Sequence, residues 1–134
     1  MNTFGRTPSV TDKPEGAGAS LRPGTVRRLG AYTTVRLTAD GPAPVTVFVD
    51  GEIDLACADE LTALLCGTLE THPQGIDVNL ASVDFFDCRG LRVLLDARVC
   101  ARRLGRYFAV GAHSPAVGRL LEMTNTRSLL TAPR

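Results

Sequence analysis

The sequence predicts an α/β fold, with a mixed sheet of four to five strands, largely parallel after an N-terminal hairpin, and helices mainly on one face. Strand-like and helix-like segments follow one another in the order β-β-α-β-α-β-α from about residue 32. Residues 76–80 alternate apolar and polar side chains, as in a strand with only one buried face. Strands joined through a helix run parallel with right-handed crossovers, so the strands after the hairpin should be parallel.

The first two strands are expected to form the antiparallel hairpin. Residues 34–37 alternate between polar and apolar side chains, and residues 45–49 are rich in β-branched residues. Asp40-Gly41-Pro42 between them is a turn signal. Leucines three and four residues apart then predict a first helix over about 56–71.

The second half of the chain is expected to alternate helix, strand and helix. A second helix is predicted to follow Asp87 and to run to about Leu104. A strand is predicted at 107–110, and Ser114 with the proline after it begins a third helix over about 115–124. A short apolar segment at 128–130 closes the domain.

The chain of 134 residues is long enough for one domain with its own core, and its first part is expected to be a tail. Eight of the first thirty residues are glycine or proline, and few are large and apolar. Such a stretch buries too little surface to offset the entropy lost on ordering. The sequence therefore predicts a flexible tail over 1–30 and a domain over 31–134.

Composition excludes several classes of function. Fifteen Lys and Arg against fourteen Asp and Glu give a net charge of +1, whereas dedicated nucleic-acid binders are clearly basic. No apolar run approaches the roughly 18 residues of a membrane span, and the N-terminus carries no apolar signal segment, so a cytoplasmic protein is expected. Four cysteines without a C-x-x-C pair and two distant histidines indicate neither a metal site nor a cofactor site.

Two loops that follow strands carry most of the chemically functional side chains. One is residues 50–54 and the other is residues 85–91. Because parallel strands end at the same edge of a sheet, and ligands of open α/β sheets gather there, both loops are expected at one site.

The two loops contain the segments Gly51-Glu52-Ile53-Asp54 and Asp87-Cys88-Arg89-Gly90-Leu91. These segments are similar to the G-E-[LIV]-D motif and the D-S-[ST]-G-[LIV] signature of STAS domains, so the chain resembles that family. Ser114-Pro115-Ala116-Val117, with the leucines after it, is similar to their S-P-A-V segment. The resemblance covers about residues 32–130 and is to bacterial anti-sigma-factor antagonists.

The resemblance implies a STAS-like fold and a non-enzymatic protein that regulates transcription by partner switching. Such proteins bind an anti-sigma factor of the serine-kinase type and so release a sigma factor. The kinase then phosphorylates the serine after the signature aspartate, and the added charge breaks the complex. By this resemblance the protein is a monomer or weak dimer, and its expected partner-binding residues are Asp54, Asp87, Cys88, Arg89, Gly90, Arg92 and Asp96.

The chain departs from the family at the phosphorylated position. Cys88 stands where the serine is expected, and Arg89 replaces a small hydroxylated residue. One interpretation is an antagonist without the phosphorylation switch, and another is a redox-sensitive sensor or scaffold in a stress-signalling complex. A cysteine phosphatase is disfavoured, since its C-x5-R pattern would require arginine where this chain has Leu94.

Two further features of the helices have alternative interpretations. The arginine-rich second helix is either a solvated face with an Arg92–Asp96 pair or a contact that selects one partner by charge. Cys57 and Cys100 lie on apolar helix stripes and are expected in the core. Cys66 lies on the opposite flank of its helix, with no evident partner.

Overall fold

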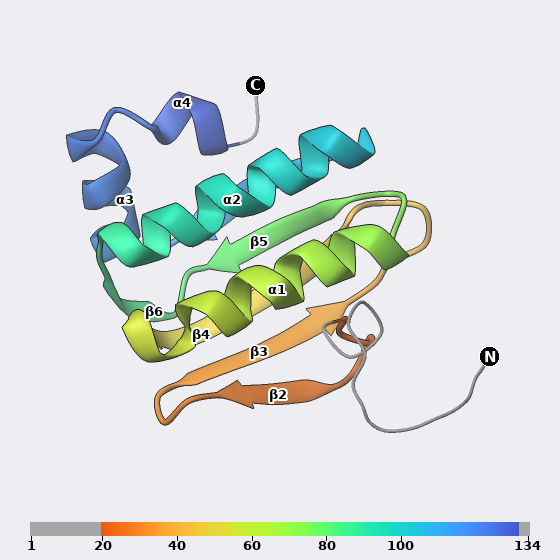
Figure 1. Ribbon diagram of the computed structural model, residues 1–134, viewed down its shortest axis with the longest axis horizontal. Helices are drawn as coiled ribbons and strands as arrows, with labels where there is room; N and C mark the ends of the chain where they lie inside the picture. Colours follow the sequence, from red (N-terminus) through yellow and green to blue (C-terminus); the bar gives the residue numbers. More distant parts are fainter. Residues whose placement is uncertain (1–19, 132–134) are drawn as a thin grey trace.

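Six strands form one mixed sheet in the computed structural model, which describes residues 20–131 (Figure 1). The predicted hairpin is confirmed, because β3 and β4 pair antiparallel from Thr33 opposite Gly51 to Thr38 opposite Thr46. The strands are β2 (Val26–Leu29), β3 (Thr33–Thr38), β4 (Val45–Ile53), β5 (Ile76–Leu80), β6 (Val83–Phe86) and β7 (Phe108–His113).

The strand order is β2-β3-β4-β5-β7, with β6 paired to the end of β4 beyond β5. The pairs β2–β3 and β3–β4 are antiparallel, whereas β4–β5, β4–β6 and β5–β7 are parallel. The predicted mixed sheet is therefore confirmed. Its four to five strands are corrected to six, because the sequence pattern revealed neither β2 nor β6.

The helices are α1 (Leu55–Thr71), α2 (Cys88–Leu104), α3 (Pro115–Met123) and α4 (Arg127–Leu130). The two long helices lie side by side across one face of the sheet, as predicted, while α3 packs beside β6 and α4 beside α2 and β7 (Figure 1). Alternate residues of β3, β4 and β5, all buried, face these helices and form the centre of the core. No helix within residues 20–131 is long and apolar enough to cross a membrane.

The predicted tail ends earlier than expected. Leu21 and Leu29 are buried, and β2 extends the sheet beside β3, so the part of the predicted tail from residue 20 to 30 belongs to the folded domain. Burial of two leucines and pairing along a strand offset the ordering cost that the glycine content suggested. Residues 1–19 lie outside the described residues, and the tail stays a prediction there.

The sheet face opposite the long helices carries polar side chains from every central strand. Arg36 of β3 stacks 3.9 Å over the ring of Phe48 in β4. Asp77 of β5 lies close against Gly111, and its Oδ1 is buried with no hydrogen-bond partner among residues 20–131. Burial raises the pKa of Asp77 above its ordinary 3.8, and the nearby backbone of Gly111 has a smaller opposite effect on this pKa.

We expect Asp77→Asn to raise the midpoint of thermal unfolding at neutral pH. A carboxyl whose pKa is raised by folding stabilises the fold below its unfolded pKa of 3.8, and this contribution is lost as the pH rises through the folded value. The gain at pH 7 should therefore shrink as the pH falls towards 4, which thermal unfolding over a pH series measures. A gain that is equal at every pH would contradict this account.

Candidate functional site

Three helices begin where neighbouring strands end, at the carboxyl edge of the parallel part of the sheet. Asp54 follows β4 and caps α1, Asp87 follows β6 and caps α2, and Ser114 follows β7 and caps α3. Ile53 at the end of β4 pairs with Phe86 at the end of β6. Asp54 and Asp87, the next residue of each strand, therefore leave the sheet side by side. The structure thus brings the two polar loops together, as the sequence predicts.

Both aspartates are engaged in helix capping. Asp54 Oδ1 accepts a hydrogen bond of 3.1 Å from the Ala56 N–H, and Asp87 Oδ1 accepts one of 2.9 Å from the Arg89 N–H. The Arg89 guanidinium also lies 3.5 Å from the second carboxylate oxygen of Asp87. These contacts hold the loop geometry, since a carboxylate cap stabilises a helix start by about 1 kcal/mol.

Cys88 is the first residue of α2, and its side chain is exposed as a free thiol. Gly90, two residues further along α2, is buried against the ring of Phe86, and a Cβ at this position would lie 2.5 Å from Phe86 Cε1. Gly90 therefore lets α2 approach β6 closely. Gly90 is buried, so it offers no exposed surface for the expected contact with a partner. Cys88 and Arg89 are both exposed.

The outward face of α2 combines a charged pair with apolar surface. Arg92 Nε lies 3.2 Å from Asp96 Oδ1, and both side chains are largely exposed, so the pair adds little stability. Leu95 is half-buried, and Val99 one turn further is 47% exposed. Arg102 and Arg103 are also exposed. This face is available for contact with another molecule along most of the helix.

Cys66, for which the sequence indicates no evident partner, interacts with Cys100 across the contact between α1 and α2. Burial, followed by this interaction with the Cys100 thiol, raises the pKa of Cys66 to about 12. Cys100 packs against the core, and Cys57 is fully buried beside Thr33, as expected of core residues. A contact between two helices depends on their packing, which periodicity within one helix does not reveal.

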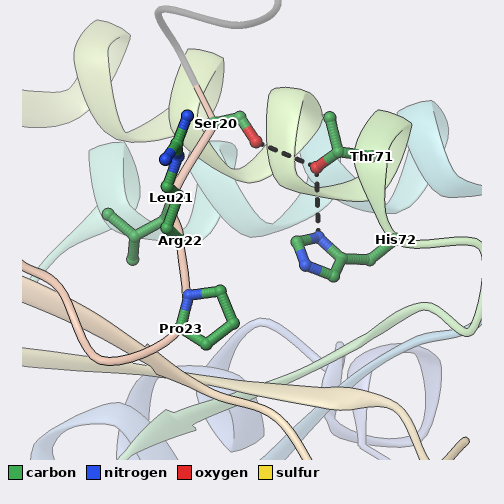
Figure 2. Close-up of a pocket in the computed structure, with 6 residues that line it drawn as sticks. All are labelled: Ser20, Leu21, Arg22, Pro23, Thr71 and His72. Carbon is green, nitrogen blue, oxygen red and sulfur yellow. Dashed lines mark hydrogen bonds between the residues drawn. The ribbon is translucent and has the colours of Figure 1, made fainter.

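A pocket of about 270 Å³ lies at the other end of α1 from Asp54 (Figure 2). Three of its polar side chains hydrogen-bond one another, because Ser20 Oγ lies 2.9 Å from Thr71 Oγ1, which lies 3.1 Å from His72 Nδ1. The 17 residues of α1 separate it from the signature loops by about 25 Å. The pocket is therefore no part of the carboxyl-edge site.

The family described as "Mlab, STAS domain" matches residues 37–131. The chain belongs to the STAS domain family. No curated protein sequence is significantly similar to it. The structure of the anti-sigma factor antagonist SpoIIAA in its unphosphorylated form is similar, with a TM-score of 0.60 and 16% identity over 75% of this chain and 88% of that chain. An anti-sigma factor antagonist from Mycobacterium paratuberculosis has a TM-score of 0.62 and 22% identity over 76% and 86%.

The carboxyl edge of the sheet has features that the motifs did not indicate. Tyr32, Leu55 and Phe85 are large, apolar and exposed, and each lies beside the Gly51–Asp54 segment. The hydrophobic pattern within a single element could not predict that they are exposed together, because one lies in a turn, one at the start of a helix and one in a strand.

Proposed function

We propose that this STAS domain is an anti-sigma-factor antagonist, which binds an anti-sigma factor of the serine-kinase type and so releases a sigma factor. The observation that carries the proposal is the exposed Cys88 at the start of α2, at the position of the signature serine and beside two capped aspartate loops. The likeness of the fold to two anti-sigma factor antagonists supports it. The protein would act in the cytoplasm, as a monomer or weak dimer, through protein–protein contacts.

The proposed role is not enzymatic. Asp54 and Asp87, the two carboxylates at the site, each cap a helix, and Arg89 pairs with Asp87. These contacts give the loops a fixed shape for recognition. A partner would meet Cys88, Arg89 and the outward face of α2 with Arg92 and Asp96.

The proposed antagonist has no serine at the switch position. Kinases of this class transfer phosphate to a hydroxyl, and Cys88 presents a thiol instead. Arg89 beside it carries positive charge, so it cannot imitate a phosphate. The complex with the anti-sigma factor should therefore persist in the presence of ATP.

The test is a binding titration with each purified serine-kinase-type anti-sigma factor of the source organism, in reducing buffer. We expect one of them to bind the wild-type protein, and Arg89→Glu with Arg92→Glu to weaken that complex by at least about tenfold, because charge reversal at an interface costs binding energy. Arg119→Glu on α3 is the matched control, since that arginine is exposed and lies on another helix. Absence of binding to every such factor would overturn the proposal.

Exposure of Cys88 favours a second candidate, a redox-sensitive STAS module. Peroxide would oxidise the thiol to a sulfenic acid, with one water formed, and would add a polar group at the contact surface. Partner binding that falls with peroxide, recovers with dithiothreitol and is insensitive to peroxide in Cys88→Ser would support this candidate. Equal binding under both conditions would exclude it.

A further inference from the structure

Cys66 of α1 and Cys100 of α2 lie at the same level of the two long helices that cover the sheet. Both helices follow paired strand ends, because Ile53 at the end of β4 pairs with Phe86 at the end of β6. Cys66 comes 13 residues after Ile53, and Cys100 comes 14 residues after Phe86. The helices run in the same direction (Figure 1), so at a rise of about 1.5 Å per residue the two cysteines differ by about 1.5 Å along them.

The two cysteines also lie on the sides of α1 and α2 that meet. The helices pack side by side, and Cys66 interacts with Cys100 between them. Asp96, one turn before Cys100 on α2, acts on Cys66 as well, as expected if this flank of α2 is turned towards α1. Facing residues of helices packed about 8–10 Å apart reach the Cα separations of about 4.4–6.8 Å that a disulfide spans.

Both members of the pair are free thiols that solvent can reach. Cys66 and Cys100 are each partly exposed, whereas Cys57 is fully buried. Cys88 is exposed, but it lies 12 residues before Cys100 on the same helix, which separates the two by about 18 Å. The pair between the helices is therefore distinct from the exposed thiol at the carboxyl edge.

We infer that Cys66 and Cys100 form a modification site, at which a peroxide joins the two long helices by an intramolecular disulfide. Disulfides of cytosolic proteins are usually transient and redox-sensing, so in a reducing compartment the pair would be a dithiol until an oxidant is present. The disulfide would then fix α2 against α1. The inference concerns this pair alone and does not depend on the proposed function.

The disulfide forms in two steps that consume one hydrogen peroxide. In the first, the Cys100 sulfur attacks the peroxide, so that the O–O bond breaks, an S–O bond forms and one water leaves. In the second, the Cys66 sulfur attacks the resulting sulfenic acid; the S–S bond forms, the S–O bond breaks, and the leaving hydroxyl takes the Cys66 proton as a second water. Two thiols thus lose two electrons, which the peroxide gains.

Cys100 is expected to be the thiol that reacts first. Burial, followed by the interaction with Cys100, raises the pKa of Cys66 to about 12, and the charges of Glu70 and Asp96 act in the same direction. Cys66 therefore stays protonated at neutral pH, and a protonated thiol is a poor nucleophile towards peroxide. Its part in the reaction is to resolve the sulfenic acid beside it, where the high local concentration compensates for its low reactivity.

The experiment treats full-length Cys88→Ser protein with hydrogen peroxide and counts the remaining thiols by alkylation in denaturant and intact mass. The substitution removes the exposed thiol, which would otherwise be oxidised as well. We expect a monomer about 2 Da lighter, in which one of the three remaining cysteines is alkylated. The midpoint of thermal unfolding should rise by at least about 5 °C, because the disulfide closes a long loop between the helices, and dithiothreitol should reverse both changes.

Cys66→Ala and Cys100→Ala, each combined with Cys88→Ser, are the matched controls, and thermal unfolding without oxidant checks their fold. Neither should lose this mass or gain stability with peroxide. The Cys66→Ala protein should instead hold a sulfenic acid at Cys100 that dimedone labels, whereas the Cys100→Ala protein should keep Cys66 as a thiol. Three alkylated cysteines in the peroxide-treated Cys88→Ser protein, or a disulfide that still forms in either control, would overturn the inference.

Discussion

Gly51→Ala should lower the free energy of unfolding by about 3 kcal/mol or more, a loss typical of strained backbone combined with a steric clash. Gly51 has φ of +106°, which side chains rarely adopt, and a Cβ there would lie 1.9 Å from the carbonyl oxygen of Tyr32. That oxygen belongs to the backbone, so it can move only if the β3–β4 pairing moves. Chemical denaturation measures the effect.

Gly41→Ala is the matched control for this prediction. Gly41 also has positive φ, of +59°, but a Cβ there would meet nothing within 4 Å. Its substitution should cost only the roughly 1 kcal/mol of a left-handed backbone with a side chain. If the two variants were equally stable, the close approach of Tyr32 to the Gly51–Asp54 segment would be refuted.

Incubation with the cognate kinase and ATP should leave the wild-type protein unmodified, and Cys88→Ser should become phosphorylated. Residue 88 is exposed at the first position of α2, so a serine there presents its hydroxyl to a kinase. The new phosphate would lie beside the carboxylate of Asp87 and should weaken partner binding by roughly tenfold or more. Intact mass measures the first effect, and a titration of the modified protein measures the second.

Two further variants sharpen the phosphorylation experiment. Cys66→Ser introduces a serine at the half-buried contact between α1 and α2, and it should stay unmodified. Cys88→Ser combined with Arg89→Ser restores small hydroxylated residues at both positions and should be phosphorylated at least as fast as the single variant. A phosphate on the wild-type loop at 85–91 would contradict the absence of a phosphorylation switch.

The long helices could be predicted because each buries one broad face, which leaves a periodic apolar pattern. The strand β6 could not, since Val83 and Phe86 are buried while Asp84 and Phe85 are exposed. This order of burial follows from the irregular register where β6 meets Gly51 and Glu52, and it removes the alternation that identifies strands. Residues 85 and 86 therefore fall in a predicted loop, and residues 83 and 84 fall in no predicted element.

The strand β2 was hidden for a different reason. Arg27 shares the covered face of the sheet with Leu29, because Arg27 pairs with Val35 and Leu29 pairs with Thr33. An arginine on that face removes the apolar alternation, so its residues resembled a tail. The candidate site shows the same limit. The motifs predicted that the loops of Asp54 and Cys88 lie at one edge of the sheet, but they did not indicate the exposed Tyr32, Leu55 and Phe85, which come from separate elements.

The central claim is that this STAS domain displaces a sigma factor from its anti-sigma factor without control by phosphorylation. The most direct measurement adds the protein to a purified complex of the two factors and follows free sigma factor by size-exclusion chromatography. We predict that sigma factor is released, and to the same extent after preincubation with ATP. Sigma factor that stays bound at saturating protein would contradict antagonism, and release that ATP abolishes would contradict the missing switch.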